Sequence, residues 1–241
     1  MKYMAFVGAD GRPAQDDLKV MQREIPGYIE AMEARGVRLA GRPLDLPPTA
    51  ATVRVRDGET LITDGPFVEA KEFIAGFDLF DCADLDEVIE VAALAPVAWF
   101  MAFEIRPFTA ELRLGADVGA FGRFEDGDSQ PWQLAIWTEK KEPAPSGGPA
   151  VQREIEAWRQ DLADQSRLII GGELEGAETA TTLRVRDGKT LLADGPFIST
   201  GAFITGLDVV HCPGRQQAIE LAATHPAARS AAIEVRPFES M

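Results

Sequence analysis

The sequence predicts an α+β protein that contains one domain twice. An internal repeat, a hairpin signal and helical periodicity support this prediction. Residues 49–108 and 179–238 are identical at 30 of 60 positions without a gap. A domain of roughly 110 residues can bury a core of its own. The predicted boundaries are a first repeat at residues 1–108, a linker at 109–130 and a second repeat at 131–241.

Each repeat is predicted to begin with a strand that leads into a helix. The first repeat opens with the apolar segment 3–7 and continues into a helical pattern at 20–35. The corresponding segments of the second repeat are 134–137 and 151–165. Gly36 follows the first helical pattern, and glycine is common where a chain leaves a helix.

A β-hairpin is predicted next in each repeat. Residues 52–56 alternate β-branched and long polar side chains, and residues 60–62 form the returning strand. Asp57 and Gly58 lie between them, and this pair is a strong signal for a tight hairpin turn. The same pattern recurs 130 residues later, so we expect one hairpin per repeat.

An inner strand, a helix and a last strand complete the repeat. Residues 73–80 are apolar on both faces, which indicates a strand covered on both sides. Asp84 can cap a helix that runs to about Leu94 and is closed by Pro96. Residues 100–107 form the last strand. The order β-α-β-β-α-β, with the hairpin added, predicts two ferredoxin-like repeats.

Two connecting segments are expected outside these elements. Residues 109–130 are rich in Gly and Asp and contain two phenylalanines, which favours an extended linker that wraps the body. Residues 140–149 are rich in Pro, Gly and Ser, and we expect an exposed loop there.

Composition excludes several classes of partner. The chain has 24 Lys and Arg against 39 Asp and Glu, a formal net charge of −15, which disfavours nucleic acid and anionic membrane surfaces. It shows no signal-peptide pattern and no membrane-length apolar stretch. Cys82 and Cys212 occupy the same position in the two repeats. We therefore expect a cytoplasmic protein with buried, reduced thiols and no cofactor.

Charged side chains recur at matching strand positions in the two repeats. In a sheet whose other face meets helices, we expect them to point into a groove between the two half-sheets and to hold a small anionic molecule. Cross-strand ion pairs with no ligand are the alternative. The candidate ligand-binding residues are Arg54, Arg56, Asp78, Glu104, Arg106, Arg184, Arg186, Asp208, Glu234 and Arg236.

The tetrapeptide Asp-Gly-Pro-Phe at 64–67 and 194–197 has a structural and a chemical interpretation. As structure, it is a rigid turn that anchors a phenylalanine. As chemistry, Asp64 and Asp194 are candidate general bases, if burial raises their pKa. His211 and His225 have no histidine at the matching positions of the first repeat. We expect both to lie at the surface, outside any metal site.

The chain resembles the branch of the YCII-related proteins that carries this tetrapeptide. The resemblance is carried by the hairpin motif at 54–58, by Thr63 with the tetrapeptide, by the acidic and basic run 69–72, and by the terminal segment 104–107. It extends over both repeats, nearly the whole chain apart from the linker. It implies a dimeric α/β barrel, here formed within one chain as a pseudo-dimer, with a further homodimer as an option.

The resemblance leaves the function open. Better-studied relatives carry a His–Asp pair in the pocket. Asp64 and Asp194 match its aspartate, whereas Tyr28 and Trp158 lie in the helices where a histidine is expected. The first repeat keeps Glu-x-Lys-Glu at 69–72 and the second does not, which indicates either one functional repeat or drift on an exposed loop.

Three functions therefore remain as hypotheses. The first is a pocket that binds a small anionic ligand. The second is an enzyme that uses Asp64 as general acid or base. The third is an accessory protein of a transcriptional regulator, because some relatives are encoded beside such proteins.

Overall fold

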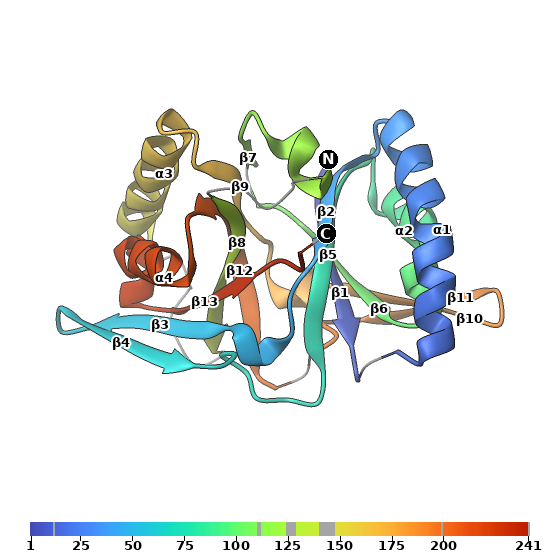
Figure 1. Ribbon diagram of the computed structural model, residues 1–241, viewed down its shortest axis with the longest axis horizontal. Helices are drawn as coiled ribbons and strands as arrows, with labels where there is room; N and C mark the ends of the chain where they lie inside the picture. The colour runs from blue at the N-terminus through green and yellow to red at the C-terminus, as the bar shows by residue number, and fades with distance from the viewer. Residues whose placement is uncertain (12, 110–111, 124–128, 140–147, 199, 241) are drawn as a thin grey trace. The chain divides into compact units, whose positions relative to one another are not determined.

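The computed structural model describes the whole chain except residues 12, 110–111, 124–128, 140–147, 199 and 241. The described residues form four α-helices and two antiparallel sheets, an α+β architecture (Figure 1). They divide into two compact units. Unit 1 comprises Met1–Pro43, Ala70–Phe108 and Glu175–Ser199; unit 2 comprises Leu44–Glu69, Thr109–Leu174 and Thr200–Met241.

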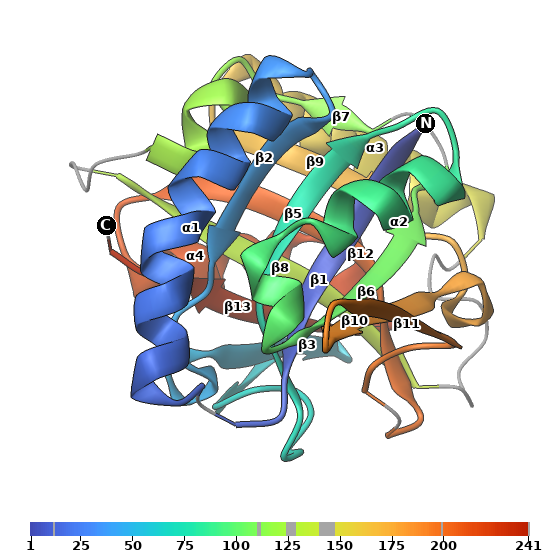
Figure 2. The same cartoon turned by 90° about the vertical axis from the view of Figure 1, so that its right-hand side faces the viewer.

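Unit 1 contains a six-stranded sheet with the order β11-β10-β6-β1-β5-β2. Helices α1 and α2 lie across one face of this sheet (Figure 2). The predicted inner strand is confirmed, because β5 lies between β1 and β2. The bounds are β1 Lys2–Ala9, α1 Gln15–Ala34, β2 Arg38–Pro43, β5 Phe73–Asp81, α2 Leu85–Ala93, η2 Pro96–Trp99, β6 Ala102–Pro107, η4 Ala177–Thr179, β10 Thr181–Arg186 and β11 Lys189–Asp194.

Unit 2 contains a seven-stranded sheet with the order β4-β3-β13-β8-β12-β9-β7. Its helices are α3 Pro149–Asp164 and α4 Arg215–Thr224, with the short helices η1 Pro47–Thr49, η3 Val118–Arg123 and η5 Pro226–Arg229. Its strands are β3 Ala51–Arg56, β4 Glu59–Asp64, β7 Arg113–Leu114, β8 Gln130–Glu139, β9 Leu168–Glu173, β12 Ala202–Cys212 and β13 Ala232–Pro237.

The two hairpins are exchanged between the repeats. Hairpin β10–β11, from the second repeat, extends the unit 1 sheet, where Thr181 is paired with Ile105 of β6. Hairpin β3–β4, from the first repeat, extends the unit 2 sheet, where Val53 is paired with Ile233 of β13. The compact units therefore differ from the sequence repeats, since each unit contains strands from both.

The hairpins form because their turns suit the local sequence. Asp57 and Gly58 both adopt positive φ angles, 52° and 81°, and Asp187 and Gly188 do the same at 51° and 70°. Two successive residues with positive φ match the right-handed twist of the flanking strands, and Asp-Gly tolerates this conformation. Asp84 caps α2 as predicted, accepting a hydrogen bond from Glu87 N at 3.0 Å.

The core of unit 2 lies between its sheet and helices. Ile155 and Leu162 of α3 and Ile219 of α4 pack against strand residues that include Leu134 and Val235. Each fully buried side chain of this kind contributes about 1.5–3 kcal/mol relative to exposure. Cys212 is in this core, and Cys82 is in the corresponding core of unit 1, where burial raises its pKa to about 11.

The segment predicted as a linker contributes to unit 2. Its β7 pairs with β9, and Phe121 in η3 is fully buried against Phe238, with ring centroids 4.9 Å apart. This gives the segment two anchor points. Most of the loop predicted at 140–149 lies outside the described residues.

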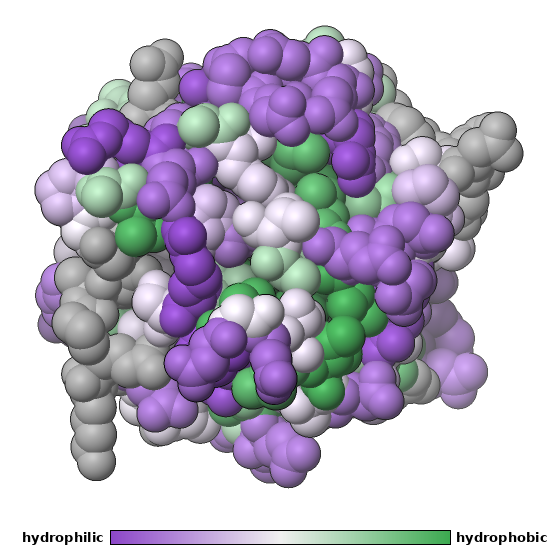
Figure 3. All heavy atoms as spheres, turned by 90° about the vertical axis from the view of Figure 1, so that its left-hand side faces the viewer, coloured by the Kyte–Doolittle hydropathy of each residue, from purple (hydrophilic) through white to green (hydrophobic). Residues whose placement is uncertain are grey.

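The side of unit 2 that carries α3, α4 and the β3–β4 hairpin is mostly hydrophilic, with hydrophobic residues exposed in a band between (Figure 3). On β4, Leu61 and Ile62 are 49% and 52% exposed. Among the helices that the structure describes, none combines the length and apolarity required to cross a membrane.

Candidate functional site

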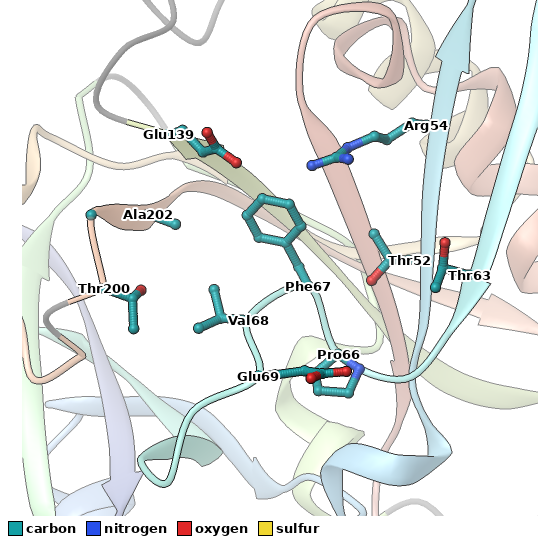
Figure 4. Close-up of a pocket in the computed structure, with 11 residues that line it drawn as sticks. Thr52, Arg54, Thr63, Pro66, Phe67, Val68, Glu69, Glu139, Thr200 and Ala202 are labelled. Atoms are coloured by element: carbon teal, nitrogen blue, oxygen red, sulfur yellow. The ribbon is translucent and has the colours of Figure 1, made fainter.

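An open groove of about 680 Å³ lies in unit 2. This volume is in the range typical of small-molecule sites. The hairpin, the Asp-Gly-Pro-Phe segment and the ends of β8 and β12 form its walls (Figure 4). The residues that line it are Thr52, Arg54, Thr63, Pro66, Phe67, Val68, Glu69, Glu139, Thr200, Gly201 and Ala202.

Arg54 is the cation of this groove. Its guanidinium lies over the Phe67 ring, 4.9 Å from the centroid. Its Nε is buried and has no hydrogen-bond partner, and no carboxylate within the described part of the chain forms an ion pair with Arg54. Stacking occupies the face of the guanidinium and leaves the N–H groups in its plane available to an acceptor.

A series of hydrogen bonds positions Phe67. Gly65 N donates to Ala50 O at 2.9 Å, and Thr52 Oγ1 donates to Gly65 O at 3.1 Å. Gly65 has a φ of 98°, which favours glycine. Phe67 N donates to Glu234 Oε2 at 3.0 Å. The tetrapeptide is therefore a rigid turn, as predicted, and it places its phenylalanine beside Arg54.

The same arrangement occurs in unit 1 around the second tetrapeptide. Phe197 N donates to Glu104 Oε2 at 2.9 Å, and the Arg184 guanidinium lies 5.2 Å from the centroid of the Phe197 ring. Thr182 Oγ1 donates to Gly195 O at 2.8 Å. Two equivalent turns thus position two equivalent arginines.

The support beneath the two phenylalanines differs. Phe67 packs against Trp137 with ring centroids 5.8 Å apart, and Trp137 is paired with Ala232. At the matching register in unit 1, Gly8 is paired with Ala102, and a β-carbon at Gly8 would overlap the Phe197 ring. Phe67 therefore rests on an indole, and Phe197 rests directly on backbone.

Arg56 and Arg186, two predicted ligand-binding residues, bind backbone carbonyls instead. Arg56 Nη1 donates to Ala228 O at 3.0 Å and to Arg229 O at 2.9 Å. Arg186 donates to the matching carbonyls of Ala98 and Trp99, at 3.1 and 2.9 Å, and to Phe100. Each arginine joins its hairpin to the end of a short helix in the same unit.

The two Glu-x-Arg pairs are buried and lie outside the groove. Arg236 Nη2 lies 3.2 Å from Glu234 Oε1, and Arg106 Nη1 lies 3.8 Å from Glu104 Oε1. Arg106 also donates to the carbonyl of Glu175. Burial raises the pKa of Glu104 and lowers the pKa of both arginines. Both glutamates position the tetrapeptide phenylalanines, so these pairs have a structural role.

The expectation that Asp78 and Asp208 share a face with the other candidate residues was wrong. Asp208 is paired with Leu134, a core residue that faces the helices, and Asp78 is paired with Ala5 in the core of unit 1. In each unit, helices pack on this face of the sheet. Alternation along the strand therefore sends these carboxylates away from Glu104 and Glu234.

Each of these aspartates pairs with an arginine. Arg38 of β2 donates from Nε to Asp78 Oδ1 at 2.7 Å, and Arg159 of α3 donates from Nε to Asp208 Oδ1 at 2.6 Å. A glycine of the neighbouring strand lies opposite each aspartate, Gly41 opposite Asp78 and Gly171 opposite Asp208. A β-carbon at Gly171 would lie 3.1 Å from Arg159 Cδ, so the glycine lets this arginine approach closely. The two arginines come from different elements, so the repeat does not predict them.

The prediction that both histidines are surface residues was also wrong. His225 is 1% exposed and His211 is 9% exposed. His225 Nε2 lies 3.2 Å from Asp208 Oδ2, while its Nδ1 accepts a hydrogen bond from Ala227 N at 3.1 Å. Burial would raise the pKa of Asp208, but Arg159 and His225 together hold it below its usual range. Among the described residues, no group of His, Cys, Asp and Glu is arranged to hold a metal.

Asp64 and Asp194, the candidate general bases, are both exposed. The side chain of Asp64 is 87% exposed and pairs with Arg215 Nη2 at 2.6 Å. It is not among the groove-lining residues. Neither aspartate therefore has the burial that the acid–base hypothesis required.

Tyr28 and Trp158, at the helix positions where a histidine was considered, join helices. Tyr28 donates to Val91 O of α2 at 3.1 Å, and Trp158 Nε1 donates to Thr224 Oγ1 of α4 at 2.9 Å. Both residues therefore have structural partners within their own unit.

The sequence pattern identified Arg54 but missed most of the groove. Thr52 could have been found, because it lies two positions before Arg54 and on the same strand face. Glu139 and Thr200 come from segments of the second repeat that carry no local signal. Only the exchange of the hairpin brings them to Arg54.

Most of the chain matches the model of a known protein family. The model of the YCII-related domain matches it twice, at residues 1–110 and 133–241. The chain belongs to the YCII-related family. An uncharacterised protein of Rhizobium meliloti (strain 1021) is 45% identical to this YCII-related chain over 78 residues, which are 32% of the chain and 56% of that protein. The match thus spans little more than half the length of that relative.

A solved structure is similar at low identity. Its title describes structure-based functional identification of a novel heme-binding protein from Thermus thermophilus. The similarity covers 98% of the YCII-related chain and 90% of that structure, with 9% identity and a TM-score of 0.41.

Proposed function

We propose that the groove of unit 2 binds a small ligand with an anionic group, and that Arg54 holds this group. The carrying observation is the free donor capacity of Arg54, which has a buried Nε without a partner and a guanidinium stacked on Phe67. A carboxylate or phosphate can accept two parallel hydrogen bonds from a guanidinium. Thr63 and Thr200 add hydroxyl groups to the same groove.

Arg54 is the best candidate because the other predicted residues are engaged. Apart from Arg184, each has a hydrogen-bond or ion-pair partner within its own unit. At most of these residues a ligand would have to displace the partners before it could bind. Among the described residues, Arg236 keeps two donors without a partner, Nε and Nη1, but it is buried and does not line the groove. Arg184 is stacked like Arg54 and is therefore the natural control.

The two other hypotheses gain less from the geometry. Proton transfer by Asp64 would require a carboxylate near the ligand, whereas its side chain is exposed and paired with Arg215. The accessory-protein hypothesis has no particular residue to support it. We retain ligand binding as the proposed function.

For the architecture, we propose that each unit is a ferredoxin-like fold with one added hairpin. The order β6-β1-β5-β2 in unit 1 and β13-β8-β12-β9 in unit 2 supports this proposal. The repeat boundaries at 1–108 and 131–241 belong to the same proposal. The intrachain barrel and a further homodimer stay predictions.

Calorimetric titration of small carboxylates and phosphate monoesters into the full chain tests the proposed function. We expect at least one compound to bind, Arg54→Gln to abolish its binding, and Arg184→Gln to leave it unchanged. A ligand at about 100 times its Kd should also add about 2.7 kcal/mol to the stability of the folded protein. Equal binding by the wild type and Arg54→Gln, or no binding by any compound, would overturn the proposal.

A further inference from the structure

The groove contains opposite charges on either side of one aromatic ring. Arg54 and Glu139 flank Phe67, and their charged ends turn toward each other across the ring (Figure 4). Both residues line the groove, yet no ion pair joins them. The part of the groove beside Phe67 therefore has a cation on one side and an anion on the other.

The charge balance of the groove disfavours a simple anion. Its ionisable lining residues are Arg54, Glu69 and Glu139, one positive and two negative. A ligand with only a carboxylate gains the contact with Arg54 but brings like charge toward the two glutamates, which is unfavourable. A ligand that also carries an ammonium group would convert this repulsion into attraction.

The ring between the charges adds an apolar surface. Phe67, Val68 and Pro66 line the groove and are partly buried. Because Phe67 is held by Glu234 and supported by Trp137, its ring is a fixed platform. A short hydrocarbon body can pack against the groove-lining parts of Phe67, Val68 and Pro66 while its two charged groups reach Arg54 and Glu139.

We propose that the ligand is amphoteric: a small apolar amino acid or related amino-carboxylate, with its carboxylate at Arg54 and its ammonium group at Glu139. This inference rests on the proposed function, because it places the anionic end at the same arginine. Glu69 also lines the groove, and its negative charge likewise favours a ligand that carries an ammonium group. The hydroxyls of Thr63 and Thr200 are available to the remaining N–H and C–O groups.

The test compares three probes of one shape: phenylalanine, 3-phenylpropionate, which lacks the amine, and phenethylamine, which lacks the carboxylate. Leucine, valine and short ω-amino acids extend the set to other bodies and spacings. Binding to the full chain is measured by calorimetry for the wild type, Glu139→Gln, Glu69→Gln and Arg54→Gln. Asp10→Asn is the matched control, since Asp10 directly follows β1 as Glu139 ends β8 at the same register.

We expect at least one amino acid to bind about tenfold more tightly than its single-charge analogues, a difference typical of one charge-assisted contact. Glu139→Gln should remove this preference and leave the acid-only analogue bound as before or more tightly. Asp10→Asn should change nothing.

Each alternative outcome has a separate meaning. If the acid-only analogue binds as tightly as the amino acid and both require Arg54, the amphoteric inference fails while the proposed function stands. If Arg54→Gln binds the amino acid normally, the proposed function fails. If no probe in the whole set binds the wild type, the amphoteric inference is overturned, and the titration with other carboxylates and phosphate monoesters decides the proposed function separately.

Discussion

Phe67 donates its backbone N–H to Glu234 at 3.0 Å, although 167 positions separate the two residues in the sequence. The mirror contact joins Phe197 to Glu104 at 2.9 Å. In each unit, a buried glutamate of one repeat thus holds the tetrapeptide of the other. The Glu234 carboxylate therefore links a groove-lining residue of the first repeat to β13 of the second repeat.

The first prediction concerns this contact. Glu234→Ala should lower the free energy of unfolding by about 3 kcal/mol, because it leaves Phe67 N and the buried Arg236 without their acceptor. It should also weaken ligand binding in the groove, since Phe67 is no longer fixed. Urea unfolding followed by tryptophan fluorescence measures the stability, and Trp132, Trp137 and Trp158 report on unit 2.

Glu234→Gln separates the two roles of this side chain, which are to accept a hydrogen bond from Phe67 N and to form an ion pair with Arg236. Its amide oxygen can still accept from Phe67 N, so it should destabilise the protein less than Glu234→Ala. An equal loss of stability in the two variants would show that the hydrogen bond to Phe67 is not what matters.

The second prediction concerns Arg56, which links hairpin β3–β4 to the end of the short helix η5. Arg56→Ala should reduce stability by about 1.5 kcal/mol, because two carbonyls at the end of η5 lose a charged donor. Ligand affinity in the groove should stay the same, as Arg56 does not line it. A large loss of affinity without loss of stability would contradict this assignment and return Arg56 to the binding site.

The third prediction concerns the residue that supports the tetrapeptide phenylalanine, which is Trp137 beside Phe67 in unit 2 and Gly8 beside Phe197 in unit 1. Trp137→Ala should cost about 3–5 kcal/mol, the usual range for removing a buried aromatic side chain, and should weaken binding above Phe67. Circular dichroism with urea is the suitable measurement, since the variant loses a fluorophore.

Gly8→Ala provides the converse test in unit 1. Its added β-carbon meets the Phe197 ring, so the ring must move and stability should fall, with no change in groove binding. Unchanged stability would show that Phe197 is free to shift.

The fourth prediction is a pH dependence. Since the pKa of Asp208 in the folded state lies below its ordinary value of 3.8, its contribution to stability is present above that pH and is lost as pH falls below it. Asp208→Asn should cost about 3–5 kcal/mol at pH 7, because the buried Arg159 loses its buried carboxylate and keeps only the exposed Glu156 as an ion-pair partner. Urea unfolding at pH 7 and at pH 3 should show a smaller difference between wild type and variant in acid. A difference that is constant with pH would contradict this.

Local sequence predicted the elements well, because turns and caps are local events. Asp57 and Gly58 adopt the expected turn, Asp84 caps its helix, and β5 is an inner strand. The partner of each hairpin could not be predicted. The segments 54–58 and 184–188 are identical, so nothing in them indicates which last strand each one joins.

The site was harder to predict for the same reason. Arg54 was singled out from its own strand, whereas Glu139 comes close to Arg54 only because β3 of the hairpin pairs with β13. The burial of His225 depends on Asp208 and Arg159, and its counterpart in the first repeat, Ala95, gives no sign of such a cluster. Long-range pairing places these residues, and a single sequence does not record it.

The exchanged hairpins also set the order in which the chain can be assembled during synthesis. β6 leaves the ribosome roughly 75 residues before β10, its sheet neighbour, which is about 4–15 s at ordinary translation rates. Until then the edge of β6 presents unpaired backbone groups, the kind of edge that invites wrong pairing. Hairpin β3–β4 waits still longer, until β13 is made near the end of the chain. In a nascent first repeat β6 is therefore an edge strand, and translation of the second repeat supplies the hairpin that covers it.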